Sequence, residues 1–281
     1  MSEAVPVGEA CRNCGHVPVG NFCPQCGQRR MDDAQRRLPH LLAQFFEAAT
    51  DLDGRFWRSL RALLLQPGRL TREYIEGRRA RWIAPMALFL LVNVAFFVGS
   101  PVSDLNLGLY EQLSYQFYSP WARELVDARL TLRGIEFDAY AAAYSDAGKD
   151  VAKAIVLLHV PAMALFWQLL FFDRRLYYAE HFVAALHAGA FIMGMALVLM
   201  WLVRPLLQLM HEALGTVQPG GRVMTPMLIA LVLWCFFRVA RVVYQVPYWR
   251  VVLSLPLMFA ALVLSHLGYR LVQFLVVFAL T

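Results

Sequence analysis

Five long apolar runs dominate the pattern of hydrophobic and polar positions along the chain. They cover residues 83–100, 151–172, 182–203, 226–246 and a last stretch that begins at residue 251. About 20 apolar residues in a helix cross the hydrocarbon core of a bilayer, which is about 30 Å thick. The runs therefore predict a mainly α-helical, multi-pass transmembrane bundle of about five spans. As a single helix the last run would be about 45 Å long, so it must tilt strongly or protrude.

The polar stretch before the first run carries a helical pattern of its own. Apolar side chains recur at positions 38, 41, 42, 45, 46 and 49, and the same spacing returns over residues 56–64. Asp53 is a candidate cap for the second of these helices, and Pro67 and Gly68 break it. Such amphipathic helices either lie in the headgroup layer of an anionic leaflet or pack against the bundle, and the pattern leaves both readings open.

The composition agrees with lipid as the main solvent. Hydrophobic residues make up 59% of the 281 residues and charged residues only 16%, a balance outside the range of soluble domains. Lys149 and Lys153 are the only lysines among 26 basic residues. Either a GC-rich genome or selection of the planar guanidinium for lipid phosphates and buried acids explains this preference for arginine.

The charges that flank the runs predict an orientation. Basic clusters fall on one side of the predicted bundle: Arg78, Arg79 and Arg81 before the first run, Arg174 and Arg175 after the second, and Arg250 after the fourth. Short basic flanks stay in the cytoplasm, whereas the loop after the first run is rich in acidic residues. The first 30 residues hold no apolar run that a signal peptidase would remove. We therefore expect a cytoplasmic amino terminus and, with five spans, an external carboxyl terminus.

Four cysteines near the amino terminus form the pattern C-x2-C-x8-C-x2-C: Cys11, Cys14, Cys23 and Cys26. Each pair puts two thiolates on one tight turn, and two facing turns supply the four sulfurs of a tetrahedral zinc site. Gly15 and Gly27 each follow a cysteine and supply the positive φ that such turns use. The pattern predicts a zinc ribbon within residues 1–30.

Other readings of the cysteines are weaker. Disulfides need an oxidising compartment, which conflicts with the expected cytoplasmic location. Iron in the same tetrathiolate cage usually needs more surrounding protein than eight intervening residues provide. Zinc held by four thiolates has no open coordination position, so its role would be structural. His16 is expected on the surface, and Cys235, within an apolar run, is expected to be a buried thiol.

A ribbon of this size has almost no core, so metal binding supplies its folding energy and its surface is available for contact. The arginines that follow it, Arg29, Arg30, Arg36 and Arg37, could meet lipid headgroups, an acidic protein partner or nucleic acid. Attachment to a bilayer makes nucleic acid the least favoured of these partners. The pattern does not define an oligomeric state.

Ionisable residues inside the runs define a second candidate site. Arg238 and Arg241 lie in the fourth run three residues apart, and a cation there needs a partner, a cavity or a short path to the interface. Four nearby residues could complete a polar pocket at the cytoplasmic end: Asp173, Glu180, His181 and His187. A haem held by two histidines is disfavoured, because His159 and His187 lie at different depths. Ion pairing, headgroup contact and helix capping are the simpler explanations.

Several segments together resemble a family of uncharacterised bacterial membrane proteins that have an N-terminal zinc ribbon before a multi-span domain of unknown function. The matching segments are "CRNCG", "FCPQCGQ", "PGRLTREYIEGRRARWIAP", "DRRLYYAEHFVAALHAGAF" and "RVARVVYQ". The resemblance covers nearly the whole chain and implies zinc and the bacterial inner membrane, but no activity. Trp82 stands where the family usually has tyrosine, an exchange between two interfacial residues.

These observations divide the chain into a zinc ribbon (1–30), cytoplasmic amphipathic helices (31–81) and a transmembrane domain (82–281). We expect a recruiting, sensing or scaffolding membrane protein that binds lipids and a cytoplasmic partner through its ribbon. The alternative is a permease for small solutes or anions that uses Arg238 and Arg241. A membrane enzyme is third, because the sequence holds no nucleophile elbow, phosphate loop or HExxH motif.

Overall fold

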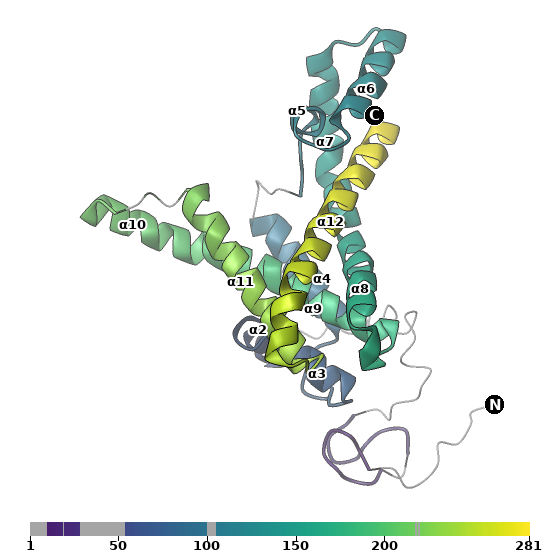
Figure 1. Ribbon diagram of the computed structural model, residues 1–281, viewed down its shortest axis with the longest axis vertical. Coiled ribbons are helices and arrows are strands. Elements are labelled where there is room, and N and C mark those ends of the chain that lie inside the picture. The colour runs from purple at the N-terminus through teal and green to yellow at the C-terminus, as the bar shows by residue number, and fades with distance from the viewer. Residues whose placement is uncertain (1–9, 19, 29–53, 100–104, 217, 219) are drawn as a thin grey trace, which may run out of the picture. The chain divides into compact units, whose positions relative to one another are not determined.

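The computed structural model describes residues 10–18, 20–28, 54–99, 105–216, 218 and 220–281, and it divides into two units. Unit 1 comprises Met1–Phe96 and Ala164–Phe259, and unit 2 comprises Phe97–Met163 and Ala260–Thr281. The long described segments are helical (Figure 1). The helix predicted over residues 38–49 and the cap at Asp53 lie outside the described residues.

Unit 1 begins its helical part with a hairpin of α2 (Gly54–Leu65) and α3 (Arg69–Ile75). The break at Pro67 and Gly68 is where the sequence predicts it, and Gly68 has φ 86°. Both helices pack against α9 (Tyr178–Val198) through apolar side chains such as Leu63 and Leu70, which are buried. The opposite face of α2 exposes Trp57 and Leu65. The sequence left open whether these helices lie in the headgroup layer or pack against the bundle. One face of the α2–α3 hairpin packs against the bundle.

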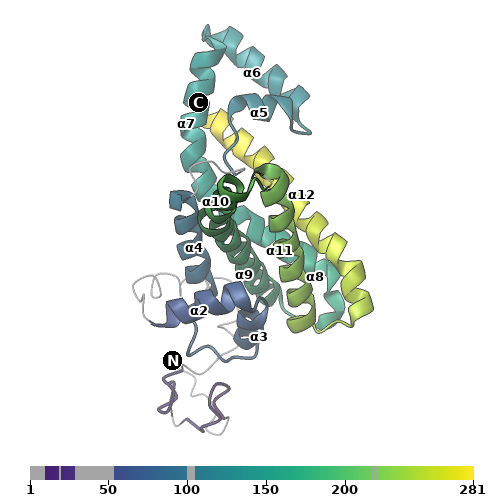
Figure 2. The ribbon, with the colours of Figure 1, turned by 90° about the vertical axis from the view of Figure 1, so that its left-hand side faces the viewer.

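The centre of unit 1 is built on α4 (Pro85–Gly99), α9 and α11 (Gly221–Val242). α4 runs beside α9 in the same direction, because Asn93 contacts Met193 and a Cβ on Gly189 would come 3.0 Å from Phe89 (Figure 2). Alanines at positions 184, 185 and 188 of α9 are also buried. Small side chains therefore let the helix backbones approach closely, as in other membrane bundles.

Four helices are long and apolar enough to cross a membrane: Phe137–Leu170, Tyr178–Leu214, Gly221–Val242 and Tyr248–Leu280. The structure thus gives four of the about five predicted spans, and the described part of the first run forms a shorter apolar helix. α4 has 15 residues, or about 22 Å, because residues 77–84 form a loop and the helix starts only at Pro85. Four long apolar helices are nevertheless the mark of a multi-pass membrane protein.

Two of the long helices are composite. Phe137–Leu170 joins α7 (Phe137–Ile155), the 3₁₀ turn η2 (Val156–Leu158) and α8 (His159–Leu170). Tyr178–Leu214 joins α9, the π-helical turn η4 (Leu199–Val203) and α10 (Arg204–Leu214), which buries no residue. A tighter 3₁₀ turn or a wider π turn inside a long helix changes its direction and often marks a functional position.

Unit 2 is a compact bundle of α5 (Leu109–Ser114), α6 (Ser119–Arg133), α7 and the end of α12 (Tyr248–Leu280). Its core holds Tyr144 from α7 and both Phe274 and Val277 from α12. Arg129 donates to the carbonyl of Phe278, and Tyr140 bonds the hydroxyl of Thr281. The last run is therefore one helix whose final turns pack on α5–α7 rather than end in lipid.

The charges on these helices limit the parts that lipid can surround. α12 carries Arg250 and Arg270 with no charge between them, a distance of about 30 Å along the helix. On the α7–α8 helix the uncharged stretch runs from Lys153 to Asp173, again about 30 Å. Both stretches equal the thickness of a hydrocarbon core. The excess length lies in the packed part of unit 2: it is residues 271–280 of α12, after Arg270, and residues 137–152 of α7, before Lys153.

The turn at Gly68 generates the first prediction. A Cβ at Gly68 would lie 3.1 Å from the carbonyl oxygen of Arg238 and 3.3 Å from Cβ of Val242, and φ there is already left-handed. Gly215 has a left-handed φ of 64° but open space around it. Gly68→Ala should therefore lower the unfolding temperature in detergent clearly more than Gly215→Ala, which carries only the backbone cost of about 1–2 kcal/mol. Equal decreases in unfolding temperature for both variants would mean that the Gly68 turn is not in close contact with α11.

Candidate functional site

The four cysteines form two equivalent turns. In the first, the N–H of Gly15 donates to the carbonyl of Cys11 (2.8 Å) and the N–H of Cys11 donates to His16 (2.7 Å). In the second, Gly27 donates to Cys23 and Cys23 donates to Gln28, each at 2.8 Å. Gly15 and Gly27 have φ 78° and 70°, so the predicted left-handed glycines are confirmed. Because both turns have the same hydrogen bonds, each turn presents its two thiols to the other turn.

The thiols fit a single metal ion. The Sγ atoms of Cys11 and Cys26 lie 3.7 Å apart, those of Cys14 and Cys23 lie 3.5 Å apart, and all four fall within 4.8 Å of one another. Tetrahedral coordination at a metal–sulfur distance of about 2.3 Å separates the sulfurs by about 3.8 Å. The four cysteines are thus positioned to bind a metal ion, and four sulfurs leave no position for a substrate.

The surface of this ribbon is partly apolar. Phe22 is 61% exposed and Val17 is 48% exposed, whereas Cys11 and Cys23 are buried. His16 is exposed, as expected, and lies apart from the four ligands as a surface residue. Two large apolar side chains on so small a unit make a surface that can be covered by another molecule.

Gln28 fastens the ribbon to the helical part of unit 1. Its backbone carbonyl accepts from Cys23 in the second cysteine turn. Its side-chain amide donates to the carbonyl of Gly77 (2.6 Å) and accepts from the N–H groups of Arg79 (3.0 Å) and Ala80 (3.1 Å). These three bonds occupy the backbone of the loop between α3 and α4, so the cysteine turn and this loop hold each other in place.

The loop that Gln28 holds is part of an arginine-rich surface, which we call the arginine loop (residues 77–82). Glu73 of α3 is its buried anchor, because it accepts from Arg69 (3.1 Å), Arg81 (2.8 Å) and the indole of Trp82 (2.8 Å). Burial would raise the pKa of Glu73, but the hydrogen bonds from Trp82, Arg69 and Arg81 outweigh it and hold the pKa below its usual value.

Other arginines of this surface are held by aromatic and acidic side chains. The guanidinium of Arg79 lies 3.6 Å above the ring of Tyr74 and donates to the Tyr74 carbonyl at 3.1 Å. Glu76 pairs with both Arg72 and Arg78. Four of the five arginines of α3 and the arginine loop thus pair with the carboxylates of Glu73 and Glu76. Five arginines against two carboxylates leave this surface positive.

Contacts within unit 1 bring the basic turns to one end. Arg250, at the start of α12, donates two hydrogen bonds of 2.6 Å to Asp173, in the turn after α8. The bonds from Arg250 outweigh desolvation and hold the pKa of Asp173 below its usual value. Arg72 of α3 donates to the side-chain oxygen of Gln245, in the turn after α11. The arginine loop and the turns around Asp173 and Gln245 therefore share the same end of unit 1.

The six residues predicted to form a polar pocket have separate surroundings. Asp173 pairs with Arg250, and Glu180 accepts from the N–H of Tyr177 at 2.8 Å in a capping box at the start of α9. Arg241 donates to the carbonyl of Val246 at 2.6 Å and lies 3.9 Å above the ring of Tyr248. These three charged side chains are thus bound to close neighbours near the helix ends, where they stabilise the local structure.

The remaining members of the predicted pocket are buried in or beside the bundle. His181 bonds the hydroxyl of Tyr244 (2.8 Å) and His187 bonds the hydroxyl of Thr71 (2.9 Å). Arg238 is half-buried, and its carbonyl is the atom that the Gly68 turn touches. His187 therefore serves the packing of α3 on α9 and does not face Arg241 or Asp173 across a shared space.

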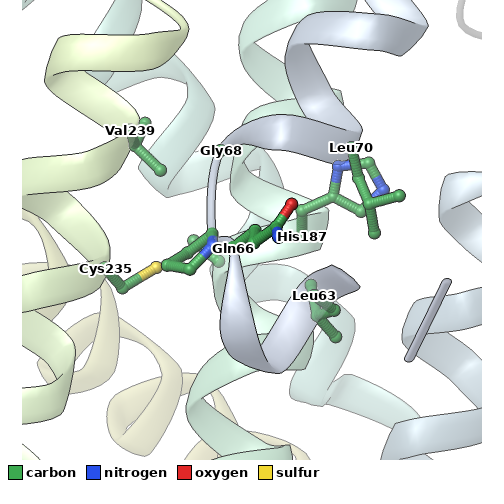
Figure 3. Close-up of a pocket in the computed structure, with 9 residues that line it drawn as sticks. Leu63, Gln66, Gly68, Leu70, His187, Cys235 and Val239 are labelled. Atoms are coloured by element: carbon green, nitrogen blue, oxygen red, sulfur yellow. The ribbon is translucent and has the colours of Figure 1, made fainter. Parts of the chain in front are cut away.

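A small cavity lies where the α2–α3 turn meets α9 and α11 (Figure 3). It has a volume of about 10 Å³ and is lined by residues that include Gly68, His187 and Cys235. Such a volume holds at most one water molecule. Cys235 is buried there, as predicted, and Arg238 is not among the lining residues. The cavity is too small for a transported solute.

Three contacts were missed in the sequence: the Gln28 bonds, the Glu73 anchor, and a pair formed by His159 and His266 in unit 2. Glutamine and glutamate side chains give no spacing signal when their partners are backbone groups or lie in a loop. The histidine pair did have a signal. Both residues lie a few positions inside the charge that ends each uncharged stretch, so they share a depth.

Comparison with known proteins matches the hairpin and α4. Residues 53–97 match the model of a family described as "Protein of unknown function (DUF3667)". The match covers less than a fifth of the chain but includes the Gly68 turn, Glu73 and the arginine loop, and it assigns no activity. No curated protein and no solved structure matches this chain.

Removing one cysteine should empty the metal site without unfolding the bundle. Cys23→Ser should reduce the bound metal from about one ion per chain to a small fraction, because the thiolates together supply the binding free energy. Elemental analysis of the detergent-purified protein measures this, and circular dichroism should show unchanged helix content. Cys235→Ser is the matched control and should keep its metal. Full metal content in the Cys23 variant would place the ion elsewhere.

The Glu73 anchor should make stability depend on acid. A lowered pKa in the folded state stabilises the protein above the unfolded-state value of about 4.3, and this contribution is lost as pH falls through the folded value. Glu73→Gln should therefore cost about 1–3 kcal/mol at pH 7, and the difference from wild type should shrink below about pH 4. Thermal unfolding in detergent at several pH values measures both. Asp146→Asn, at an exposed pair with Lys149, should change little.

Proposed function

We propose that the protein is a bacterial inner-membrane docking protein, in which a cytoplasmic zinc ribbon and the arginine loop together recruit a protein partner to the membrane surface. The single observation that carries this proposal is the set of Gln28 bonds. They join the second cysteine turn to the backbone of Gly77, Arg79 and Ala80. A metal that folds the ribbon therefore also fixes the arginine loop at the start of the first apolar helix.

The proposed metal is zinc. A tetrathiolate cage with sulfur separations near those of a tetrahedron suits zinc, and a closed coordination shell suits a structural ion. Zinc would be held by Cys11, Cys14, Cys23 and Cys26 and would supply folding free energy to the ribbon, with no chemical step.

The proposed orientation rests on charge. The arginine loop and the turns at Asp173 and Gln245 share one end of unit 1, and short basic segments stay in the cytoplasm. Reduced thiols are stable there, which agrees with metal-binding cysteines. The opposite end of each span would then face the periplasm.

Two surfaces are suited to different partners. Exposed Phe22 and Val17 on the ribbon offer an apolar contact for a protein, with arginines nearby for its acidic residues. The outer face of α2 presents Trp57 and Leu65 together with Arg58 and Arg61, a combination that favours anionic lipid headgroups. A permease or an enzyme has less support, because the predicted pocket residues are engaged locally and the cavity at His187 holds one water at most.

A photo-crosslinking amino acid at position 22 tests the proposal in cells. We expect a discrete protein adduct of the full-length chain, because Phe22 is the most exposed large apolar side chain among the described residues of the ribbon. Cys23→Ser should abolish the adduct by unfolding the ribbon, and Gln28→Ala should weaken it several-fold while keeping the metal. Cys235→Ser and Gln25→Ala are the controls and should leave the adduct unchanged. An adduct that survives Cys23→Ser, or a chain that crosslinks to lipid only, would contradict recruitment by the ribbon.

A further inference from the structure

The connection between α5 and α6 exposes three aromatic side chains of unit 2. Tyr115, Phe117 and Trp121 are all exposed, and they lie close together in residues 115–121, which we call the aromatic turn. Exposed apolar surface of this size is normally covered by lipid or by another molecule, because it costs free energy in water. Neither the proposed ribbon nor the arginine loop involves these residues.

Hydrogen bonds hold the aromatic turn in one shape. The N–H of Gln116 donates to the hydroxyl oxygen of Ser119 (2.9 Å), and this hydroxyl donates to the carbonyl of Gln112 (3.0 Å). Arg123 of α6 donates to the carbonyl of Leu113 at 2.6 Å. Two carbonyls at the end of α5 are thus bound by side chains of α6. A turn fixed in this way presents its exposed rings at a defined place in the fold.

Buried neighbours attach the aromatic turn to the core of unit 2. Tyr118, between the exposed residues, is itself buried and donates to Gln112. Its ring lies 5.7 Å from that of Phe274 on α12, and the ring of Trp121 lies 6.2 Å from the same side chain. Phe117 packs edge-on against Tyr118 at 5.0 Å. The aromatic turn therefore lies at the level of Phe274 along α12.

Two charged residues of unit 2 mark where its uncharged stretches end. Arg270 ends the stretch of α12, and Lys153 ends that of the α7–α8 helix. The hydroxyl of Tyr269, next to Arg270, lies 3.4 Å from the carbonyl oxygen of Ala152, next to Lys153. The two charges therefore lie at the same level. Because charged side chains stay out of hydrocarbon, this level marks one boundary of the hydrocarbon core.

The aromatic turn lies just outside this boundary. Phe274 follows Arg270 by four residues, which is about 6 Å along the helix. The guanidinium of Arg270 also donates to Gln116 of the turn at 3.3 Å. The headgroup layer on each side of a bilayer is about 5–8 Å thick. The three exposed aromatic side chains therefore lie at the depth of the headgroups.

α6 leads away from this level. Arg129 donates to the carbonyl of Phe278, which lies about 12 Å beyond Arg270 along α12. Leu132 lies three residues farther along α6 and is 86% exposed, compared with 66% for Phe117. Phe117 thus lies at the depth of the headgroups, whereas the more exposed Leu132 lies beyond them.

We propose that the aromatic turn is a membrane anchor of unit 2, in which Tyr115, Phe117 and Trp121 insert into the headgroup layer of a phospholipid bilayer. Tyrosine and tryptophan are enriched at this depth, because the ring contacts apolar groups while the phenol or indole N–H bonds headgroups and water. Phe117 adds an apolar contact between them. Arg123 and Glu124 give the nearby part of α6 charges of both signs, so the anchor needs no anionic lipid.

A crosslinkable side chain at position 117 of the full-length protein tests the anchor. The protein is placed in phosphatidylcholine nanodiscs and irradiated, and the mass of the intact chain is measured. We expect the mass to increase by one phospholipid, in a yield several-fold higher than from position 132, although Leu132 is the more exposed residue. Equal yields at the two positions, or no lipid adduct at position 117, would overturn the proposal. A product of twice the chain mass would show that a second copy covers the turn instead.

Depth is measured separately on the wild-type chain with phosphatidylcholine that carries a photoreactive group either near the glycerol or at the end of an acyl chain. The shallow probe should label residues 115–121, and the deep probe should label residues 257–264 in the middle of the uncharged stretch of α12. Labelling of the aromatic turn mainly by the deep probe, or by neither, would contradict an anchor in the headgroup layer.

A double variant and a matched control connect the labelling to the side chains. Tyr115→Ser combined with Phe117→Ser should reduce shallow labelling of the aromatic turn several-fold, because the apolar contact with the headgroup layer is lost. Leu132→Ser removes an apolar side chain of greater exposure and should leave this labelling unchanged. Unchanged labelling in the double variant would show that the exposed rings do not hold the turn at the membrane. The wild-type measurements decide the proposal even where the double variant fails to fold.

Discussion

A charge loses its hydration when it enters hydrocarbon, and this cost limits every long helix of the protein. On α12 and on the α7–α8 helix, charged residues stand about 30 Å apart with none between them, as the thickness of a bilayer core requires. Each helix is longer than this uncharged stretch, and its excess length packs with α5 and α6 around Tyr144 and Phe274. The same constraint acts at the other end, where Asp173 pairs with Arg250 and where Arg241 reaches the carbonyl of Val246.

Among the described residues, hydrogen bonds of Gln28 join the ribbon to the helical part of unit 1. Gln28 satisfies two N–H groups and one carbonyl of the arginine loop while its own carbonyl completes a cysteine turn. Bonds of this kind contribute about 1 kcal/mol each, far less than the metal contributes to the ribbon. In the proposed docking protein, a partner could therefore displace the loop without removing the metal.

The sequence predicted the apolar parts of the long helices, the break at Pro67 and Gly68, and the cysteine turns with their glycines, because each leaves a periodic or spaced signal. It did not predict α5, α6 and most of α7, because the polar stretch after the first run was interpreted as a loop. It did not predict that α4 starts only at Pro85, since an apolar count extends through Ile83 whether or not the backbone is helical. It also missed Glu73 as an anchor, because nothing in its spacing shows that Trp82 and Arg81 fold back onto it. His159 was compared with His187 rather than His266, and only the depth below Arg270 and Lys153 would have paired it correctly.

Polar groups are distributed differently in the two units. In unit 1 three buried polar side chains each meet one partner: His187 meets Thr71, His181 meets Tyr244, and Ser59 meets the N–H of Ile83. Single bonds of this kind fix helix packing and leave little room for water. In unit 2 the polar groups follow one another along α12 from Ser265 to Gln273, and several of their atoms need water. Unit 2 therefore concentrates polar groups on one face of α12, whereas unit 1 holds the ribbon and the arginine loop.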